Sequence, residues 1–238
     1  MSLENGVTSA EHFDGYAEDY DGALNQGLSV TGEGKDFFAR ERVLWVSRCL
    51  QKLAIRPARI MDFGCGTGSA IPLLLELPQA ESTIGVDPSD KSLEVAKRTY
   101  SDSSSRFFRN DQYKPEASID LVYCNGVFHH IPPAERLAEL GYIWDCLRPG
   151  GIFAFWENNP WNPGTRYVMS RIPFDRHAIT LSPPEARSLL RRAGFEIIRT
   201  DFLFIFPSWL KPLRRIEPLF GRLPVGGQYQ VLCQRLAT

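Results

Sequence analysis

The sequence predicts an α/β fold, a doubly wound sheet of seven mostly parallel strands with helices on both faces. Three observations predict it. From residue 59 onward, short apolar strands alternate with amphipathic segments of helical period, which is typical of parallel strands joined by right-handed crossovers. A glycine run, Gly64-Cys-Gly-Thr-Gly68, stands between the first strand and the first helix of this series. The last strand, residues 228–236, follows as a hairpin-like return, so it is expected to run antiparallel to the rest.

The segment ahead of the sheet comprises residues 1–54. Its polar first part carries the aromatic residues Phe13, Tyr16 and Tyr20 and predicts a short helix that bears them. A second helix is expected over residues 36–54, where apolar residues recur near helical spacing.

The strands are short apolar runs, expected at residues 59–63, 82–87, 106–109, 119–124, 151–156, 195–206 and 228–236. The helices between them are expected at residues 69–77, 90–100, 132–147 and 182–193. The third of these helices starts at two prolines, which a first turn tolerates. Its buried face is expected to consist of Leu137, Leu140, Trp144 and Leu147. It ends at residues 148–151, a turn built from helix breakers.

Two insertions, residues 157–181 and 207–226, interrupt this alternation. Both are rich in proline, aromatic and basic residues and are expected on the substrate side. Since one α/β domain with insertions accounts for 238 residues, the chain 1–238 is expected to form a single domain.

The composition excludes a disordered, collagenous or coiled-coil chain, because 43% of the residues are hydrophobic and 23% are charged. The chain has 27 Lys and Arg against 28 Asp and Glu, so no nucleic-acid partner is expected. The charge is uneven, since residues 157–225 carry 11 Lys and Arg against 6 Asp and Glu. This basic part is expected either to meet an anionic or lipid-linked partner or to be a solvated surface.

The five cysteines include no C-x-x-C pair, so neither a disulfide framework nor a zinc site is predicted. The first residues lack the apolar stretch of a signal peptide, and no apolar run approaches the roughly 18 residues of a membrane span. These observations favour a reducing compartment and a cytoplasmic location.

The glycine run is the sharpest functional signal. Glycines let the backbone turn tightly and approach a ligand, while the N–H groups at the helix start face it. Asp87 follows the second strand, where a carboxylate can accept both hydroxyls of a ribose. Together these features predict an adenosine-containing cofactor.

Two residues bear on which cofactor this is. Ser69 occupies the third glycine position of the dinucleotide fingerprint, and Asp62 places a negative charge next to the loop. A pyrophosphate would be repelled there, whereas a sulfonium and an ammonium group would be attracted. This favours S-adenosylmethionine over NAD.

Four stretches resemble motifs of the class I S-adenosylmethionine-dependent methyltransferases, in the branch that includes ubiquinone and menaquinone methyltransferases. They are Asp62-Phe-Gly-Cys-Gly-Thr-Gly68, Gly85-Val-Asp-Pro-Ser89, Asp120-Leu-Val-Tyr-Cys-Asn-Gly-Val-Phe-His-His-Ile-Pro132 and Leu147-Arg-Pro-Gly-Gly151. The resemblance covers residues 12–156 and fades beyond them. It implies a Rossmann-like sheet and a methyl transfer that yields S-adenosylhomocysteine.

The resemblance also implies a set of cofactor-binding residues. The N-terminal segment would form a lid whose Tyr20, or else Tyr16, reaches the cofactor. Asp87 would hold the ribose, Asp111 the adenine amino group, and the residues after the fourth strand the amino acid part. The full set is Tyr20, Asp62, Gly64, Cys65, Gly66, Gly68, Asp87, Pro88, Asp111, Cys124 and Asn125.

His129 and His130 are the candidate catalytic residues. Imidazole acts as a general base near neutral pH and can take the proton of a substrate hydroxyl. Hydrogen bonding within the loop is the alternative role. No metal is predicted, because the spacing shows no third ligand.

The candidate acceptor-binding residues are Trp156, Trp161, Arg166 and Tyr167, joined by Arg171 and His177. Aromatic rings stack on a sugar or another ring, and arginine clamps a phosphate or carboxylate. The second insertion mixes apolar and basic residues, so it is expected to rest on a membrane surface, to form a dimer contact or to cover the core. The oligomeric state is left open.

The favoured function is O-methylation of a sugar, glycolipid or secondary metabolite. The second hypothesis for an enzyme is C-methylation of a quinone or prenylated ring. A non-catalytic S-adenosylmethionine binder and an NAD(P)-dependent oxidoreductase are the alternatives outside methyl transfer.

Overall fold

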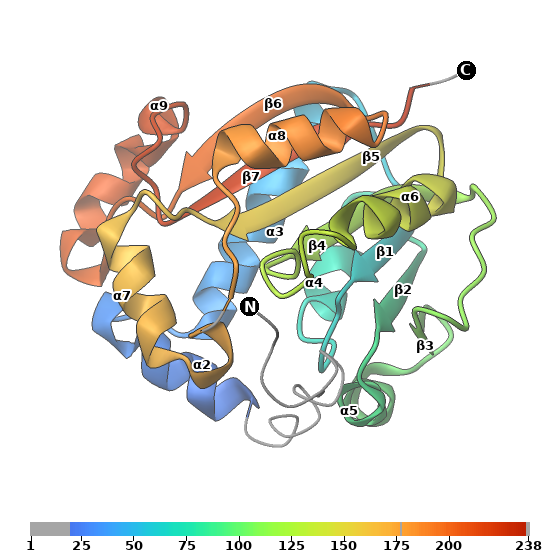
Figure 1. Ribbon diagram of the computed structural model, residues 1–238, viewed down its shortest axis with the longest axis horizontal. Coiled ribbons are helices and arrows are strands. Elements are labelled where there is room, and N and C mark those ends of the chain that lie inside the picture. Colours follow the sequence, from blue (N-terminus) through green and yellow to red (C-terminus); the bar gives the residue numbers. More distant parts are fainter. Residues whose placement is uncertain (1–19, 177, 237–238) are drawn as a thin grey trace.

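The computed structural model describes residues 20–176 and 178–236, without the side chains of Tyr20, Asp21 and Ala23. In this part of the chain, seven strands form one sheet in the order β3-β2-β1-β4-β5-β7-β6 (Figure 1). The strands are β1 Arg59–Phe63, β2 Ser82–Asp87, β3 Ser105–Arg109, β4 Ile119–Asn125, β5 Leu147–Asn158, β6 Glu196–Leu203 and β7 Gln228–Gln234. The pairs among β1 to β5 are parallel, and β7 runs antiparallel to both β5 and β6. The predicted sheet and its antiparallel last strand are confirmed.

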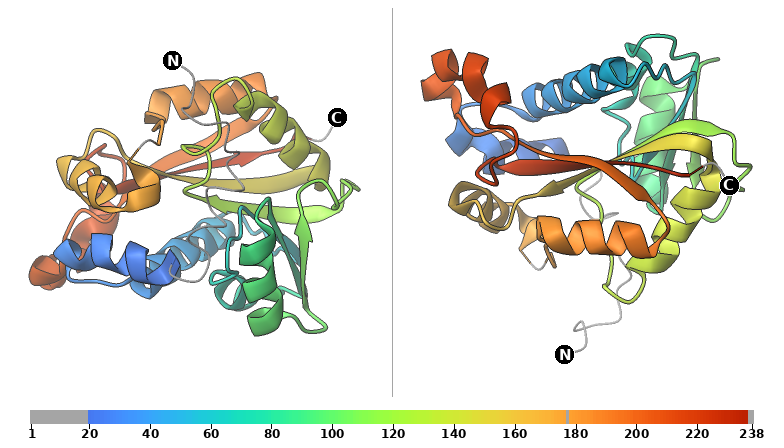
Figure 2. Two further views of the ribbon diagram at one scale, coloured as in Figure 1. Left: turned by 60° about the horizontal axis from the view of Figure 1, so that its bottom comes forward. Right: turned by 90° about the horizontal axis from the view of Figure 1, so that it is seen from above.

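Helices cover both faces of this sheet (Figure 2). They are α2 Tyr20–Leu28, α3 Lys35–Lys52, α4 Ile71–Leu75, α5 Asp90–Tyr100, α6 Arg136–Cys146, α7 Pro163–Arg171, α8 Pro183–Arg192 and α9 Glu217–Phe220. Short 3-10 helices are η1 Ser29–Thr31, η2 Pro173–Asp175 and η3 Ser208–Ile216. No described helix combines the length and the apolar character that a membrane crossing requires.

The alternation of side chains along the strands builds two cores. On one face, α3 and α4 pack against alternate residues such as Leu121 and Tyr123 of β4. On the other face, α6 and α8 pack against the intervening residues, Val122 and Cys124. Since both faces are covered, the central strands read as continuous apolar runs.

Both predicted boundaries of α6 and one residue of its predicted buried face are wrong. The helix begins at Arg136, because the residues after Pro132 first form a turn closed by the Glu135 N–H and the Pro132 carbonyl. Leu137 is therefore 38% exposed rather than part of the buried face. Leu147 already pairs with Ile119, so the stretch expected as a turn opens β5 with an irregularity in its register.

Both insertions contain helices that the sequence did not predict. Residues 157–181 form α7 and η2, and residues 207–226 form η3 and α9. Together with α2, they gather at one end of the molecule, on the left in Figure 1. There they lie beside the carboxyl-terminal half of β5, whose last residues pair with the first residues of β7. The two insertions therefore lie at the edge of the sheet where the parallel strands end. The strand order reverses between the adjacent strands β1 and β4, and open α/β sheets bind ligands at such a switch point.

Candidate active site

The loop after β1 holds Gly64, Gly66 and Gly68 in left-handed backbone conformations. A Cβ atom at Gly64 would lie 2.3 Å from the Val127 side chain, so only glycine fits there. A Cβ atom at Gly66 would meet nothing within 4 Å, so the loop is open to a ligand on that side. The N–H groups of Gly64 and Cys65 donate to the Val86 carbonyl at 2.8 and 3.0 Å, which fixes the loop to β2.

Asp87, the last residue of β2, ties the loop together from the other side. Its Oδ2 accepts the N–H of Gly66 at 2.8 Å, and its Oδ1 accepts the N–H of Ser89 at 2.9 Å. Pro88 between them is half-buried. The Asp87 carboxylate, which is predicted to bind the ribose, thus contacts the glycine loop. Its binding of the ribose stays a prediction.

Asp62 lies next to last in β1 and is buried. Burial and the negative charge of Asp87 raise its pKa to about 7, against the opposing charge of Arg42. A buried carboxyl group with a raised pKa loses its proton more easily when a cation binds beside it, because the cation stabilises the carboxylate. The position therefore suits an ammonium or sulfonium group.

Two side-chain amide oxygens at the ends of β3 and β4 are buried and have no hydrogen-bond partner among the described residues. They belong to Asn110, after β3, and to Asn125, at the end of β4. Buried polar atoms normally have partners, so these oxygens are suited to accept hydrogen bonds from a bound ligand. The open side of Gly66 and these acceptors fit an adenosine cofactor with an ammonium group.

Asp111 was the residue expected at the adenine. Its carboxylate is exposed and accepts a hydrogen bond from Arg109 at 3.1 Å, so Asn110 is the better placed acceptor. Tyr20 starts α2, its side chain lies outside the described part, and Tyr16 lies outside it entirely. Their predicted role as a lid stays a prediction.

The two thiols near the cofactor site are not nucleophiles. Cys65 and Cys124 are buried, and burial raises the pKa of each well above that of a free thiol. Both therefore remain neutral at physiological pH. A contact of Cys124 with the cofactor through its backbone stays a prediction.

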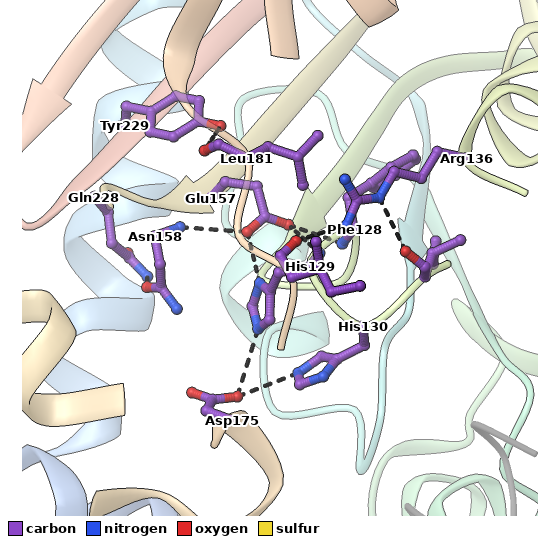
Figure 3. Close-up of polar contacts among 12 residues, drawn as sticks. Phe128, His129, His130, Arg136, Glu157, Asn158, Asp175, Leu181, Gln228 and Tyr229 are labelled. Atoms are coloured by element: carbon purple, nitrogen blue, oxygen red, sulfur yellow. Dashed lines mark hydrogen bonds and ion pairs between the residues drawn. The ribbon is translucent and has the colours of Figure 1, made fainter. Parts of the chain in front are cut away.

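Four titratable side chains form a chain of contacts beyond β4 (Figure 3). His129 Nδ1 lies 2.6 Å from Glu157 Oε2, and His129 Nε2 lies 3.4 Å from Asp175 Oδ1. The same Asp175 oxygen lies 3.2 Å from His130 Nε2. Glu157 also accepts the backbone N–H of Phe128 at 2.8 Å, which fixes the loop that carries both histidines.

The two histidines hold protons very differently. Burial lowers the pKa of His129, but the charge of Glu157 and hydrogen bonds to Asp175 and Glu157 raise it overall to about 10. Burial and the positive charge of His129 lower the pKa of His130, against the contact with Asp175. Burial raises the pKa of Asp175, but its hydrogen bonds with both histidines lower it to about 2. At neutral pH His129 is therefore charged and His130 neutral, so the structure favours only His130 as a base.

The sequence did not show a third metal-type ligand, and the structure does. Ligand atoms of His129, His130 and Asp175 all lie within 4.8 Å of one another. The hydrogen bond of His129 with Glu157 and the ion pairs of Asp175 with both histidines account for this arrangement without a metal. The expectation of no metal stays a prediction.

A cavity of about 990 Å³ opens beside these histidines. Its walls come from α2, α3, α7, η2, η3 and the end of β6. Apolar side chains line much of it, among them Leu24, Phe37, Phe38, Val168, Phe204 and Phe206. His130, Asp175 and Asn125 also line it, so the cavity joins the candidate base to the cofactor side of β4.

The predicted acceptor-binding residues separate in the structure. Tyr167 lines the cavity, whereas Trp161 and Arg166 are exposed outside its lining. The expectation for Trp156 is wrong, because its side chain is fully buried in the core under α3 and is out of reach of an acceptor. Arg171 is exposed, and His177 lies outside the described residues.

The sequence missed Glu157, Asp175 and the aromatic wall from α3. Glu157 is the first charged residue after the apolar run of β5, and such a residue at a strand end is a signal that could have been used. Asp175 and Phe38 lie in segments without a motif. Only the fold brings them to the histidines.

Comparisons with known proteins cover the cofactor side best. The family described as Methyltransferase domain matches residues 61–153. The trans-aconitate 2-methyltransferase of Deinococcus radiodurans is 36% identical over 98 residues, which are 41% of this chain and 36% of that protein. The enzyme of the same name from Enterobacter sp. is 30% identical over 49% of this chain and 46% of its own length. The chain thus spans less than half the length of these curated relatives.

Solved structures with the same fold cover the whole chain. A SAM-dependent methyltransferase from Thermotoga maritima is 19% identical, with a TM-score of 0.65 over 96% of this chain and all of its own. The [4+2]-cyclase SpnF is 17% identical, with a TM-score of 0.64 over 100% of this chain and 99% of its own. At these identities the likeness concerns the fold alone, and the fold also serves a reaction other than methyl transfer.

Proposed function

We propose that the chain is a class I S-adenosylmethionine-dependent methyltransferase that O-methylates a small amphipathic acceptor, with His130 as the general base. The observation that carries the proposal is the pairing of neutral His130 with Asp175 in the wall of a largely apolar cavity. A glycolipid or an apolar secondary metabolite with a hydroxyl group suits this cavity better than a free sugar.

The residues of the loop and strand ends would hold the cofactor. Asp87 would accept the ribose hydroxyls, Asn110 would accept from the adenine amino group, and Asp62 with Asn125 would face the amino acid part. When bound, S-adenosylmethionine supplies an activated methyl group and leaves as S-adenosylhomocysteine. Holding donor and acceptor in line supplies roughly 7–11 kcal/mol of the barrier reduction in such transfers.

His130 would remove the proton of the acceptor hydroxyl. Because His130 Nε2 lies 3.2 Å from the Asp175 carboxylate, the neutral His130 ring would carry its proton on Nε2 and its lone pair on Nδ1. Once protonated, His130 would be stabilised by the Asp175 carboxylate. The Glu157–His129 pair would keep Asp175 and the loop in position.

Two other acceptors remain as alternatives. The apolar lining also suits C-methylation of a prenylated quinol, whose phenol would use the same base. The relatives named trans-aconitate methyltransferases suggest a carboxylate acceptor, which is already ionised at neutral pH and needs no base. The cytoplasmic location likewise stays a prediction.

Calorimetric titration with S-adenosylmethionine, S-adenosylhomocysteine and NADH comes first, followed by an acceptor panel assayed for S-adenosylhomocysteine release. The panel should contain glycolipids, hydrophobic alcohols, prenylated quinols and tricarboxylates. We expect binding of the first two ligands, no binding of NADH, and release with an amphipathic hydroxyl compound. Release only with carboxylates, unchanged in His130→Ala, would overturn the proposed acceptor and base. Cofactor binding with no release would favour a silent binder.

A further inference from the structure

The rim segment, residues 207–226, exposes apolar side chains in unusual density. Fifteen large hydrophobic residues are exposed in the described part of the chain, and seven of them lie in this segment of 20 residues. They are Trp209, Leu213, Ile216, Leu219, Phe220, Leu223 and Val225. Trp209 and Leu219 are 73% and 80% exposed. Contiguous apolar exposure of this kind marks an interaction surface rather than an ordinary solvated one.

The helical part of the rim segment is amphipathic. Trp209, Leu213, Ile216 and Phe220 follow one another at intervals of four, three and four residues across η3 and α9. In η3, a 3-10 helix with three residues per turn, Leu213 and Ile216 lie on the same side. Trp209 and Phe220 add further exposed apolar surface at the two ends of this helical part.

The charges that the rim segment turns outward are all positive. Its one acidic residue, Glu217, is turned inward, where it accepts the N–H of Phe204 at 2.6 Å. Arg214 is also engaged inside, with Glu33 at 2.7 Å. Lys211 and Arg215 are exposed beside these apolar residues. Arg222 is exposed as well, but it lies 3.8 Å from the Asp201 carboxylate. The outer surface of the rim segment thus combines apolar residues with the cations Lys211 and Arg215.

The rim segment also forms the mouth of the acceptor cavity. Trp209, Lys211 and Arg215 line the cavity and are exposed at the same time. The red segment in Figures 1 and 2 stands at the edge of the molecule beside α2 and α7, whose residues form other walls of the cavity. The rim segment therefore connects the exposed apolar surface with the lining of the cavity.

We propose that the rim segment docks the protein on an anionic phospholipid surface. Apolar side chains enter the boundary between head groups and acyl chains, and cations attract the anionic head groups. A symmetric contact between two copies fits less well, because the two surfaces that meet would both carry the positive charges of Lys211 and Arg215 and no outward-facing acidic residue of the rim segment. Docking itself does not depend on methyl transfer. Only the delivery of an acceptor from the bilayer rests on the proposed function.

Co-sedimentation with vesicles tests the docking directly. The full chain would be mixed with vesicles of phosphatidylcholine alone and with vesicles containing phosphatidylglycerol, without cofactor or acceptor. We expect binding to the anionic vesicles, weaker binding to the neutral ones, and loss of binding as salt shortens the roughly 10 Å screening length of 0.1 M buffer. Leu219→Glu and Trp209→Glu should each lower the partition coefficient roughly tenfold or more. Lys211→Glu with Arg215→Glu should lower it about fivefold for each cation removed.

Leu137→Glu is the matched control, since Leu137 is an exposed leucine on α6, away from the rim segment. Its vesicle binding should equal that of the parent chain, and calorimetric binding of S-adenosylmethionine should be kept in all variants as a check on folding. Equal binding to both vesicle types, or none to either, would overturn the proposal. A concentration-dependent dimer that Leu219→Glu abolishes, without vesicle binding, would assign the surface to a second copy instead. Because no catalysis is measured, a wrong acceptor assignment does not affect this result.

Discussion

At the scale of single residues, His129 and His130 are chain neighbours whose surroundings separate their proton affinities. A general base must be neutral to act, so we expect kcat to fall as pH drops through the pKa of His130, which burial and the charge of His129 hold below that of a free imidazole. The charge of His129 persists until about pH 10, so it should not limit the rate at neutral pH. His130→Ala should lower kcat by about 10²–10⁴-fold and flatten the acid limb, with the Kd for S-adenosylmethionine unchanged. If the pH profile of kcat in His130→Ala equals that of the parent chain, His130 is not the general base.

Asp62 gives a second pH dependence, in binding. Its pKa of about 7 means that a large share of the apo protein carries the proton at neutral pH. A cationic ligand favours the carboxylate, so binding of S-adenosylmethionine should release protons and tighten as pH rises from about 6 to about 8. Calorimetry in two buffers of different ionisation enthalpy measures the release. Asp62→Asn should bind with no such dependence, and an identical proton release in that variant would locate the titrating group elsewhere.

At the scale of helices and strands, residues with local signals were the predictable ones. Strands β1 and β2 have the predicted boundaries, because charged or polar residues precede their apolar runs and glycine or proline follows. In contrast, α7 and η3 could not be predicted, since prolines and scattered polar residues hide their helical periodicity. Their stability comes from contacts far along the chain, such as Thr165 donating to the Gly227 carbonyl at 2.6 Å.

Helix α8 shows such a local signal with a measurable effect. Ser182 and Glu185 form a capping box, and the Ser182 N–H donates to Glu185 at 2.7 Å. Ser182→Ala should lower the free energy of unfolding by about 1 kcal/mol, because a helix N–H group loses its partner. Urea unfolding measures the change, with Ser170→Ala on the exposed side of α7 as the control. Equal midpoints for the two variants would show that the capping box contributes nothing to stability.

At the scale of the whole molecule, the cofactor side could be predicted from one continuous stretch of sequence and the acceptor side could not. The glycine loop, Asp87 and Asn125 lie at strand ends whose order follows from the alternating pattern. Glu157 and Asp175 reach the histidines only because β5 pairs beside β4 and the first insertion folds back over the sheet. The acceptor cavity is assembled from both insertions and the N-terminal helices, so no local motif could report it.

Because the proposed cofactor site spans several strands, binding of the cofactor is expected to raise the thermal stability of the whole fold. The proposed cofactor residues lie at the ends of β1, β2, β3 and β4, so a bound molecule would join four consecutive strands of the sheet, from its edge strand β3 to β4. Ligand at about 100 times its Kd adds roughly 2.7 kcal/mol to the free energy of unfolding. For a chain of this size that raises Tm by roughly 5–10 °C. Scanning calorimetry with S-adenosylhomocysteine should show this rise, NADH should leave Tm unchanged, and Asp87→Ala should lose most of it. A rise with NADH alone would mean that the glycine loop holds a dinucleotide.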